Sequence, residues 1–169
     1  MTYRLRIRAA PVQQLSTGLS LVMALALAHA EEITTCREPS GTAYFHYGGL
    51  VDKKGSGWQP DKIGGGAVTL IQNDDLSFDI LYLDGRKKPI SSVQDGGLVR
   101  LLRSGADTLT LLVHYPGATT EIYSFFKEKD GQGRFTMMQS RTGDRAVIPK
   151  SSVLLGVCEA IRFDLVRGN

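Results

Sequence analysis

The sequence predicts an all-β protein, built as a single antiparallel meander of about eight strands. Short segments rich in β-branched and aromatic residues recur about every ten residues, and turn residues separate them. Nothing between these segments reads as a crossover helix, and connections this short join antiparallel neighbours, which excludes parallel α/β folds. We therefore expect a closed or nearly closed barrel, with a two-sheet β-sandwich as the alternative.

The strands follow one another with recognisable turn signals. Residues 42–50 are rich in aromatic side chains, and a loop rich in Gly and Lys separates them from 67–72, whose sequence AVTLIQ favours a strand. Residues 77–83 place Phe78, Ile80 and Tyr82 on one face, and Asp84-Gly85 after them is a strong hairpin signal. A short strand is expected at 90–94.

The second half of the chain continues the same pattern. Residues 98–103 also fit a helical turn, but flanking glycines favour a strand. Residues 108–115 alternate clearly, and two further strands, 119–127 and 134–140, are joined by a turn rich in Gly and Asp. Residues 146–166 can hold one or two strands with a break at Pro149, and 151–156 are compatible with a strand, a short helix or a 3₁₀ turn.

Residues 1–30 have the pattern of a secretory signal peptide. Three arginines precede an apolar run of about ten residues, whereas a membrane-spanning helix needs about 20. The small residues Ala28 and Ala30 then stand at the positions that a signal peptidase reads. We expect cleavage between Ala30 and Glu31, which leaves residues 31–169 as one all-β domain, periplasmic or secreted, with no stable membrane anchor.

Export determines how the two cysteines are interpreted. Cys36 and Cys158 lie near the two ends of the mature chain, and in an oxidising compartment two lone cysteines usually pair. We therefore expect a structural disulfide between them, with two buried free thiols as the alternative. The net charge of +3 comes from the three arginines of the leader, since the remaining 17 Lys/Arg match 17 Asp/Glu. Nucleic acid is therefore not an expected partner.

No motif for catalysis, metal or cofactor stands out. The run Gly64-Gly65-Gly66 precedes a strand and lacks a following Lys-Ser or Lys-Thr, so it reads as a loop and not as a phosphate cradle. His46 and His114 lack the companion ligands that zinc needs, and the acidic turns at Asp74-Asp75, Asp84 and Asp130 are typical of tight turns. No G-x-S-x-G serine is present. We expect no metal site and no cofactor.

Aromatic residues supply the candidate binding contacts. Tyr44, Tyr47 and Trp58 fall close together near the mature N-terminus, and tyrosine and tryptophan combine apolar area with a hydrogen-bonding tip. Trp58 lies in the polar loop expected at 55–60, so it is the first choice for a contact with a ligand or partner.

Residues 137–141, residues 148–152 and Cys158 resemble the C-terminal half of short exported bacterial proteins of unassigned activity. At the level of fold alone, an exported β-meander with one disulfide also resembles lipocalin-like barrels and the periplasmic lysozyme inhibitors. The lipocalin signature G-x-W is absent, because Gly57 directly precedes Trp58. Fold does not imply function, so neither resemblance carries an activity to this chain.

These observations favour an exported binding module, for a small apolar molecule or for a partner protein. A hydrolase or isomerase whose acids come from separate loops is the second hypothesis, and a structural envelope protein is the third. A catalytic cleft should collect buried acids or histidines, whereas the interior of a carrier should be apolar. The absence of strong catalytic motifs favours binding over catalysis.

Overall fold

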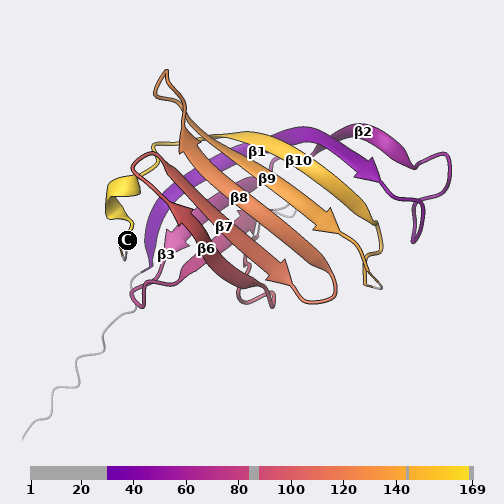
Figure 1. Cartoon of the computed structure of the whole chain (residues 1–169), viewed down its shortest axis with the longest axis horizontal. Helices are drawn as coiled ribbons and strands as arrows, with labels where there is room; N and C mark the ends of the chain where they lie inside the picture. Colours follow the sequence, from indigo (N-terminus) through magenta and orange to yellow (C-terminus); the bar gives the residue numbers. More distant parts are fainter. Residues whose placement is uncertain (1–29, 84–87, 144, 168–169) are drawn as a thin grey trace, which may run out of the picture.

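A computed structural model of the chain describes residues 30–83, 88–143 and 145–167. These residues form an all-β protein of ten strands and one short 3₁₀ helix (Figure 1). The strands are β1 (Glu31–Phe45), β2 (Gly57–Lys62), β3 (Ala67–Gln72), β4 (Phe78–Leu83), β5 (Pro89–Ser91), β6 (Leu98–Ser104), β7 (Thr108–Tyr115), β8 (Thr119–Lys127), β9 (Gly133–Arg141) and β10 (Lys150–Cys158), and the helix is η1 (Phe163–Leu165).

All ten strands belong to one antiparallel sheet that curls into an open half-barrel (Figure 1). Nine strands lie in the order β5-β4-β3-β1-β10-β9-β8-β7-β6, and β2 pairs with the remaining part of β1. The sheet therefore consists of two meanders, β3–β5 and β6–β10, that β1 joins by pairing with β3 on one side and β10 on the other.

This arrangement corrects the expected architecture. The prediction of a closed or nearly closed barrel is wrong, because the sheet is open. The described residues form neither a single meander of eight strands nor a sandwich of two packed sheets. Closure would need a ladder between the edge strands β5 and β6. However, β5 has only three residues, and Pro89 lacks the backbone N–H that a ladder requires.

Most predicted strands are confirmed within a residue or two, but the first was placed too late. Strand β1 begins at Glu31 and not at residue 42, and the polar segment 57–62 forms β2. Residues 98–103 form a strand as expected. Residues 151–156, for which the sequence allowed a strand, a short helix or a 3₁₀ turn, lie inside β10. The hairpin signal at Asp84-Gly85 lies outside the described residues, although β4 and β5 pair on either side of it.

Strand β1 has a β-bulge in its middle, a feature that bends a strand and increases its local twist. Glu38 has a φ of 51°, and the pairing register with β10 shifts between Arg37 and Ser40. Beyond this bulge the partner on the other edge changes from β3 to β2. Gly41 passes so close to β10 that a Cβ would lie 2.1 Å from the carbonyl oxygen of Val153, so only glycine fits there.

The concave face of the half-barrel holds the hydrophobic core. Alternate residues of β7, β8, β9 and β10 point inward against those of β1, β3 and β4. Phe125 and Phe135 stack at 5.9 Å between ring centroids, and both are fully buried. Gly156 makes this possible, because a Cβ there would come within 2.2 Å of the Phe135 ring.

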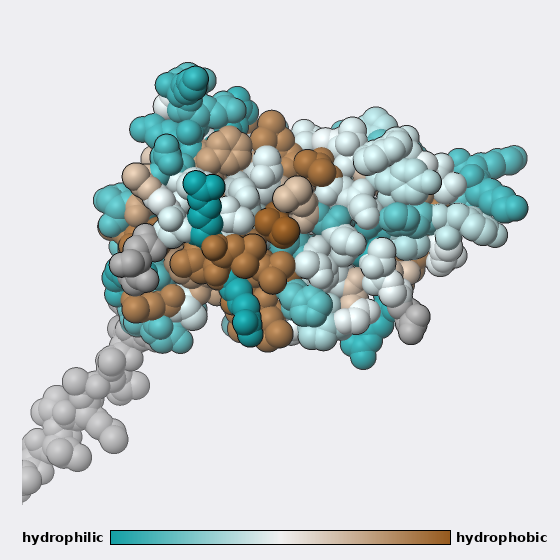
Figure 2. Space-filling view, viewed as in Figure 1, coloured by the Kyte–Doolittle hydropathy of each residue, from teal (hydrophilic) through white to brown (hydrophobic). Residues whose placement is uncertain are grey.

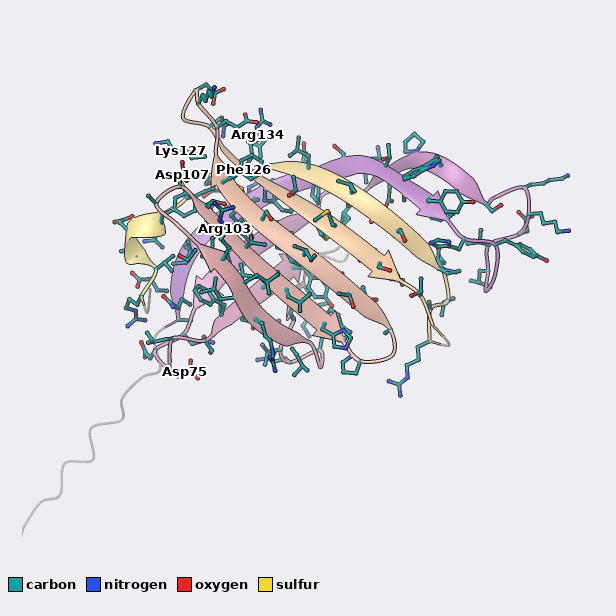
Figure 3. All side chains as sticks on the ribbon, in the orientation of Figure 1. Asp75, Arg103, Asp107, Phe126, Lys127 and Arg134 are labelled. Atoms are coloured by element: carbon teal, nitrogen blue, oxygen red, sulfur yellow. A yellow bond between two sulfur atoms is a disulfide. The ribbon has the colours of Figure 1, made fainter. Side chains whose placement is uncertain are left out.

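One end of the half-barrel is filled by the C-terminal segment. Residues Ile161, Phe163, Leu165 and Val166 pack on the core, and the Arg162 N–H donates to the carbonyl of Ile33. The buried side chain of Gln72 exchanges two hydrogen bonds with the backbone of Arg167. This end, which we call the plugged end, contains the β3–β4 and β8–β9 turns. The charged side chains labelled in Figure 3 on β6–β9, such as Arg103, Lys127 and Arg134, gather at the same end.

The convex face of β6–β10 is unusually apolar for a solvent-facing surface. Figure 2 shows a group of hydrophobic residues over β6 and β7, where Leu98, Leu101 and Leu102 are exposed. Further exposed apolar side chains lie on β9 and β10, among them Met138 and Val153. Apolar side chains therefore lie on both faces of these strands.

The predicted disulfide is confirmed and joins the two central strands. Cys36 of β1 and Cys158 of β10 are bonded, directly opposite each other in the ladder. The sequence separation is 122 residues, so the bond closes nearly the whole domain. No helix among the described residues is long and apolar enough to span a membrane.

Replacing Cys36 or Cys158 by Ser should lower the free energy of unfolding by about 2–5 kcal/mol, because the unfolded chain regains the entropy of a long open loop. Urea denaturation in oxidising buffer measures this change. Wild-type protein treated with a reductant should shift in the same direction. An unchanged unfolding midpoint in the variants would contradict a stabilising role for the bond.

Candidate functional site

The end of the half-barrel opposite the plugged end contains a cavity of about 680 Å³. Its wall is formed by the start of β3, the end of β4, the β7–β8 turn and the end of β9. Much of the lining is apolar, from Val68, Leu83 and Met137, and small residues, including Gly66 and Ala118, also line it. A cavity of this size falls in the range of small-molecule sites.

A row of polar side chains crosses the concave face at the bottom of this cavity. Glu121, Gln139 and Ser152 lie side by side on β8, β9 and β10, as the ladder registers show. Glu121 and Gln139 line the cavity and are each 8% exposed. Gln139 Nε2 donates to Glu121 Oε1 at 2.6 Å. On the side of this row toward the plugged end, the buried inward residues of these strands are largely apolar.

Two oxygens of this row have no hydrogen-bond partner among the described residues, Gln139 Oε1 and Ser152 Oγ. Leaving a buried polar atom unpaired costs about 1–3 kcal/mol. Such a cost points to a site at which another molecule completes the hydrogen bonding.

Three tyrosines surround Glu121. Tyr123 is 3% exposed, and its hydroxyl donates to Glu121 Oε2 at 2.8 Å. Tyr82 and Tyr115 line the cavity nearer its opening, and the Tyr82 hydroxyl donates to Asp95 Oδ2 at 2.8 Å. All three tyrosines therefore line the cavity, and the hydroxyls of Tyr123 and Tyr82 are bonded to its two acids, Glu121 and Asp95.

Burial and negative charge keep these phenols neutral. Burial raises the pKa of Tyr123 well above its ordinary value, and the Glu121 charge raises it further. Burial also raises the pKa of Tyr115 to about 12, with smaller contributions from Glu121 and Asp95. The pKa of Tyr82 rises for the same reasons, burial first and then Asp95. At neutral pH the three hydroxyls are thus hydrogen-bond donors.

The opening of the cavity carries charges of both signs. Asp95 lies in the turn after β5, Arg141 at the end of β9, and Arg145 in the loop after it. Neither arginine forms an ion pair with any described residue. A neighbouring pair, Lys150 Nζ and Asp61 Oδ2 at 2.5 Å, is largely buried and ties β10 to β2 across β1.

The aromatic residues singled out in the sequence lie away from this cavity. Tyr44 of β1 and Trp58 of β2 are neighbours in the ladder, with ring centroids 5.6 Å apart. Trp58 is 71% exposed and Tyr47 is 65% exposed. A binding role for Tyr44, Tyr47 and Trp58 stays a prediction, and they form a surface separate from the cavity.

The remaining candidates from the sequence have local partners. His46 Nε2 pairs with Ser151 Oγ at 3.1 Å, and His114 Nδ1 pairs with Thr120 Oγ1 at 3.0 Å. No group of three His, Cys, Asp or Glu that could hold a metal forms within residues 30–83, 88–143 and 145–167.

The glycine run and the acidic residues also occupy turns. Gly64-Gly65-Gly66 form the turn before β3, as expected. Asp75 accepts two hydrogen bonds from Ser77, which lower the pKa of its carboxyl group. Asp130 accepts from the Gln132 N–H, and Asp84 lies outside the described residues.

Comparison of the chain with protein-family models, with curated proteins and with solved structures gave no match. The resemblance to exported bacterial proteins, lipocalin-like barrels and lysozyme inhibitors therefore stays a prediction.

Sequence reasoning missed the residues at the centre of the cavity. Glu121 has the same phase as the buried Tyr123 along β8, and Gln139 the same phase as the buried Met137 along β9, so both belong to the inward face. An acid and an amide at inward positions of two consecutive predicted strands are unusual in a core, and this pattern could have identified Glu121 and Gln139 from the sequence.

Replacing Tyr123 by Phe removes a hydrogen bond to a buried carboxylate, which should lower the free energy of unfolding by about 1.5–3 kcal/mol. Urea denaturation measures the loss. Replacing Tyr47 by Phe is the matched control, since this exposed hydroxyl should contribute little. Equal stability of the two variants would contradict the assigned hydrogen bond.

Proposed function

We propose that this protein is an exported binding module that holds a small, mainly apolar molecule in the cavity at the open end of its half-barrel. The observation that carries this proposal is the cavity itself, with an apolar wall and a few buried polar groups at its base. This combination is typical of small-molecule sites, in which apolar area supplies affinity and a few polar groups fix orientation.

The distribution of acids and histidines favours binding over catalysis. Among the described residues that line the cavity, Glu121 and Asp95 are the acids, and there is no histidine. Glu121 already accepts hydrogen bonds from Tyr123 and Gln139 on its two oxygens. A carboxylate held in this way is suited to recognising a ligand group rather than to exchanging protons during a reaction cycle.

A partner protein is the second candidate, supported by a different surface. Tyr44 and Trp58 form an edge-to-face pair on β1 and β2, in the part of the molecule that extends beyond the half-barrel (Figure 1). Exposed aromatic pairs of this kind are common anchors in protein interfaces.

Export is supported by the leader pattern and by the disulfide, and the absence of a membrane-spanning helix among the described residues is compatible with it. The residues of the proposed leader lie largely outside the described part of the chain. Strand β1 begins at Glu31, so cleavage after Ala30 would leave every strand intact.

Filling the cavity should abolish binding. Thr119 lines the cavity, whereas its neighbour Thr120 lies on the opposite face of β8. We expect Nile red, a neutral apolar dye, to brighten and shift to the blue with the wild-type protein and with Thr120→Trp, but not with Thr119→Trp. Absence of a response with the wild type, or an equal response from both variants, would contradict the proposed site.

Intact-mass measurement tests export. Protein produced with its own leader and purified from the exported fraction should have the mass of residues 31–169 less two hydrogens, because the leader is removed and the two thiols are oxidised. A full-length mass, or protein found only in the cytoplasm, would overturn the export proposal without affecting the cavity.

A further inference from the structure

Glu121 is a buried acid without a cationic partner in the described part of the chain. Its two carboxylate oxygens accept only from neutral donors, the Tyr123 hydroxyl and the Gln139 amide. An unpaired buried charge is costly, and neutral donors compensate it less than an opposite charge does. Because Glu121 lines the cavity, a cation that enters the cavity can supply the missing charge.

Gln139 indicates the type of cation. Its Nε2 donates to Glu121 Oε1, and a flipped amide would place two oxygens 2.6 Å apart, which is repulsive for an ionised carboxylate. The amide orientation is thereby fixed, and Oε1 is left without a partner among the described residues. A hydrogen-bond donor is therefore needed beside Glu121, and a protonated amine carries both the charge and the N–H groups.

The tyrosines supply suitable walls for such a group. Tyr82, Tyr115 and Tyr123 line the same cavity as Glu121, and the Tyr123 hydroxyl donates to its carboxylate. The face of a tyrosine ring carries negative electrostatic potential and attracts an ammonium group, most strongly when water is excluded.

The arginines at the opening do not cancel this preference. Arg145 is exposed and Arg141 is only half-buried, so water and salt screen both guanidinium groups. Glu121 lies deeper and is screened less, so it dominates the potential at the bottom of the cavity. Asp95, also exposed at the opening, is screened in the same way.

We infer that the ligand of this cavity is a protonated amine on an apolar carbon skeleton, with its ammonium group between Glu121, Gln139 Oε1 and the tyrosine rings. The inference rests on the proposed binding of a small molecule in the cavity and specifies its chemical class. The apolar skeleton lies against Val68, Leu83 and Met137.

Competition for bound Nile red tests this inference with three probes of equal chain length: octylammonium, 1-octanol and octanoate. Octylammonium should displace the dye at a concentration about tenfold lower than 1-octanol, because a close charge pair and cation–π contacts add to the same apolar burial. Octanoate should be the weakest competitor.

Two variants test whether Glu121 causes the preference for octylammonium. Glu121→Gln keeps the size of the side chain and one acceptor oxygen for the Gln139 amide, and replaces the other oxygen by an NH2 donor beside the Tyr123 hydroxyl. It should remove the preference for octylammonium while Nile red still binds. Arg141→Gln is the matched control, and should keep or increase the preference. Thermal melting confirms that each variant folds. If Glu121→Gln does not fold, Tyr82→Leu replaces it and should reduce the preference several-fold through the lost ring.

The outcomes separate this inference from the proposed function. Stronger displacement by octanoate, or an unchanged preference in Glu121→Gln, would overturn the amine assignment while dye binding still supported a small-molecule site. Equal displacement by all three probes would also overturn it. A wild-type protein that does not bind Nile red would contradict the proposed function itself.

Discussion

The pairing of β1 with β10 is the constraint on which the rest of the structure depends. These strands come from the two ends of the described chain, and their ladder is the only link within the sheet, among the described residues, between the β3–β5 and β6–β10 meanders. The cavity draws one wall from each meander, so its shape is set by this distant pairing. Joining segments so far apart carries a large loop-closure entropy, and the Cys36–Cys158 bond offsets it at the point where the strands meet.

The two ends of the half-barrel differ in how the concave face of the open sheet is covered. At the plugged end, Phe163 and its neighbours cover the core, and Gln72 satisfies the backbone of Arg167. At the other end no element of the described chain covers the concave face, and polar groups replace apolar ones on β8 and β9. An uncovered core made only of apolar side chains would tend to close up and exclude water. Glu121 and Gln139 instead place hydrogen-bonding groups at the base of the cavity, which favours an open, polar space there.

Much of the sheet could be predicted from local pattern. Strands β3, β7 and β8 have the bounds that alternation and turn residues predict, and oxidative pairing of two lone cysteines predicts the disulfide. Strand β1 was partly missed because residues 31–41 mix Glu, Thr, Pro and Ser, and its strand character comes from partners on both sides. The order of strands was also beyond prediction, because pairing between distant segments leaves no local signal.

The cavity could not be found from the sequence for a related reason. Each of its groups is ordinary in its own strand, and only the ladder registers bring Glu121 beside Gln139 and Gln139 beside Ser152. Part of its lining consists of small turn residues, such as Gly96 and Ala118, which carry no sign of a site in the local sequence. The open end of the half-barrel therefore leaves a buried charge within reach of solvent, and the proposed binding of a small molecule depends on this combination.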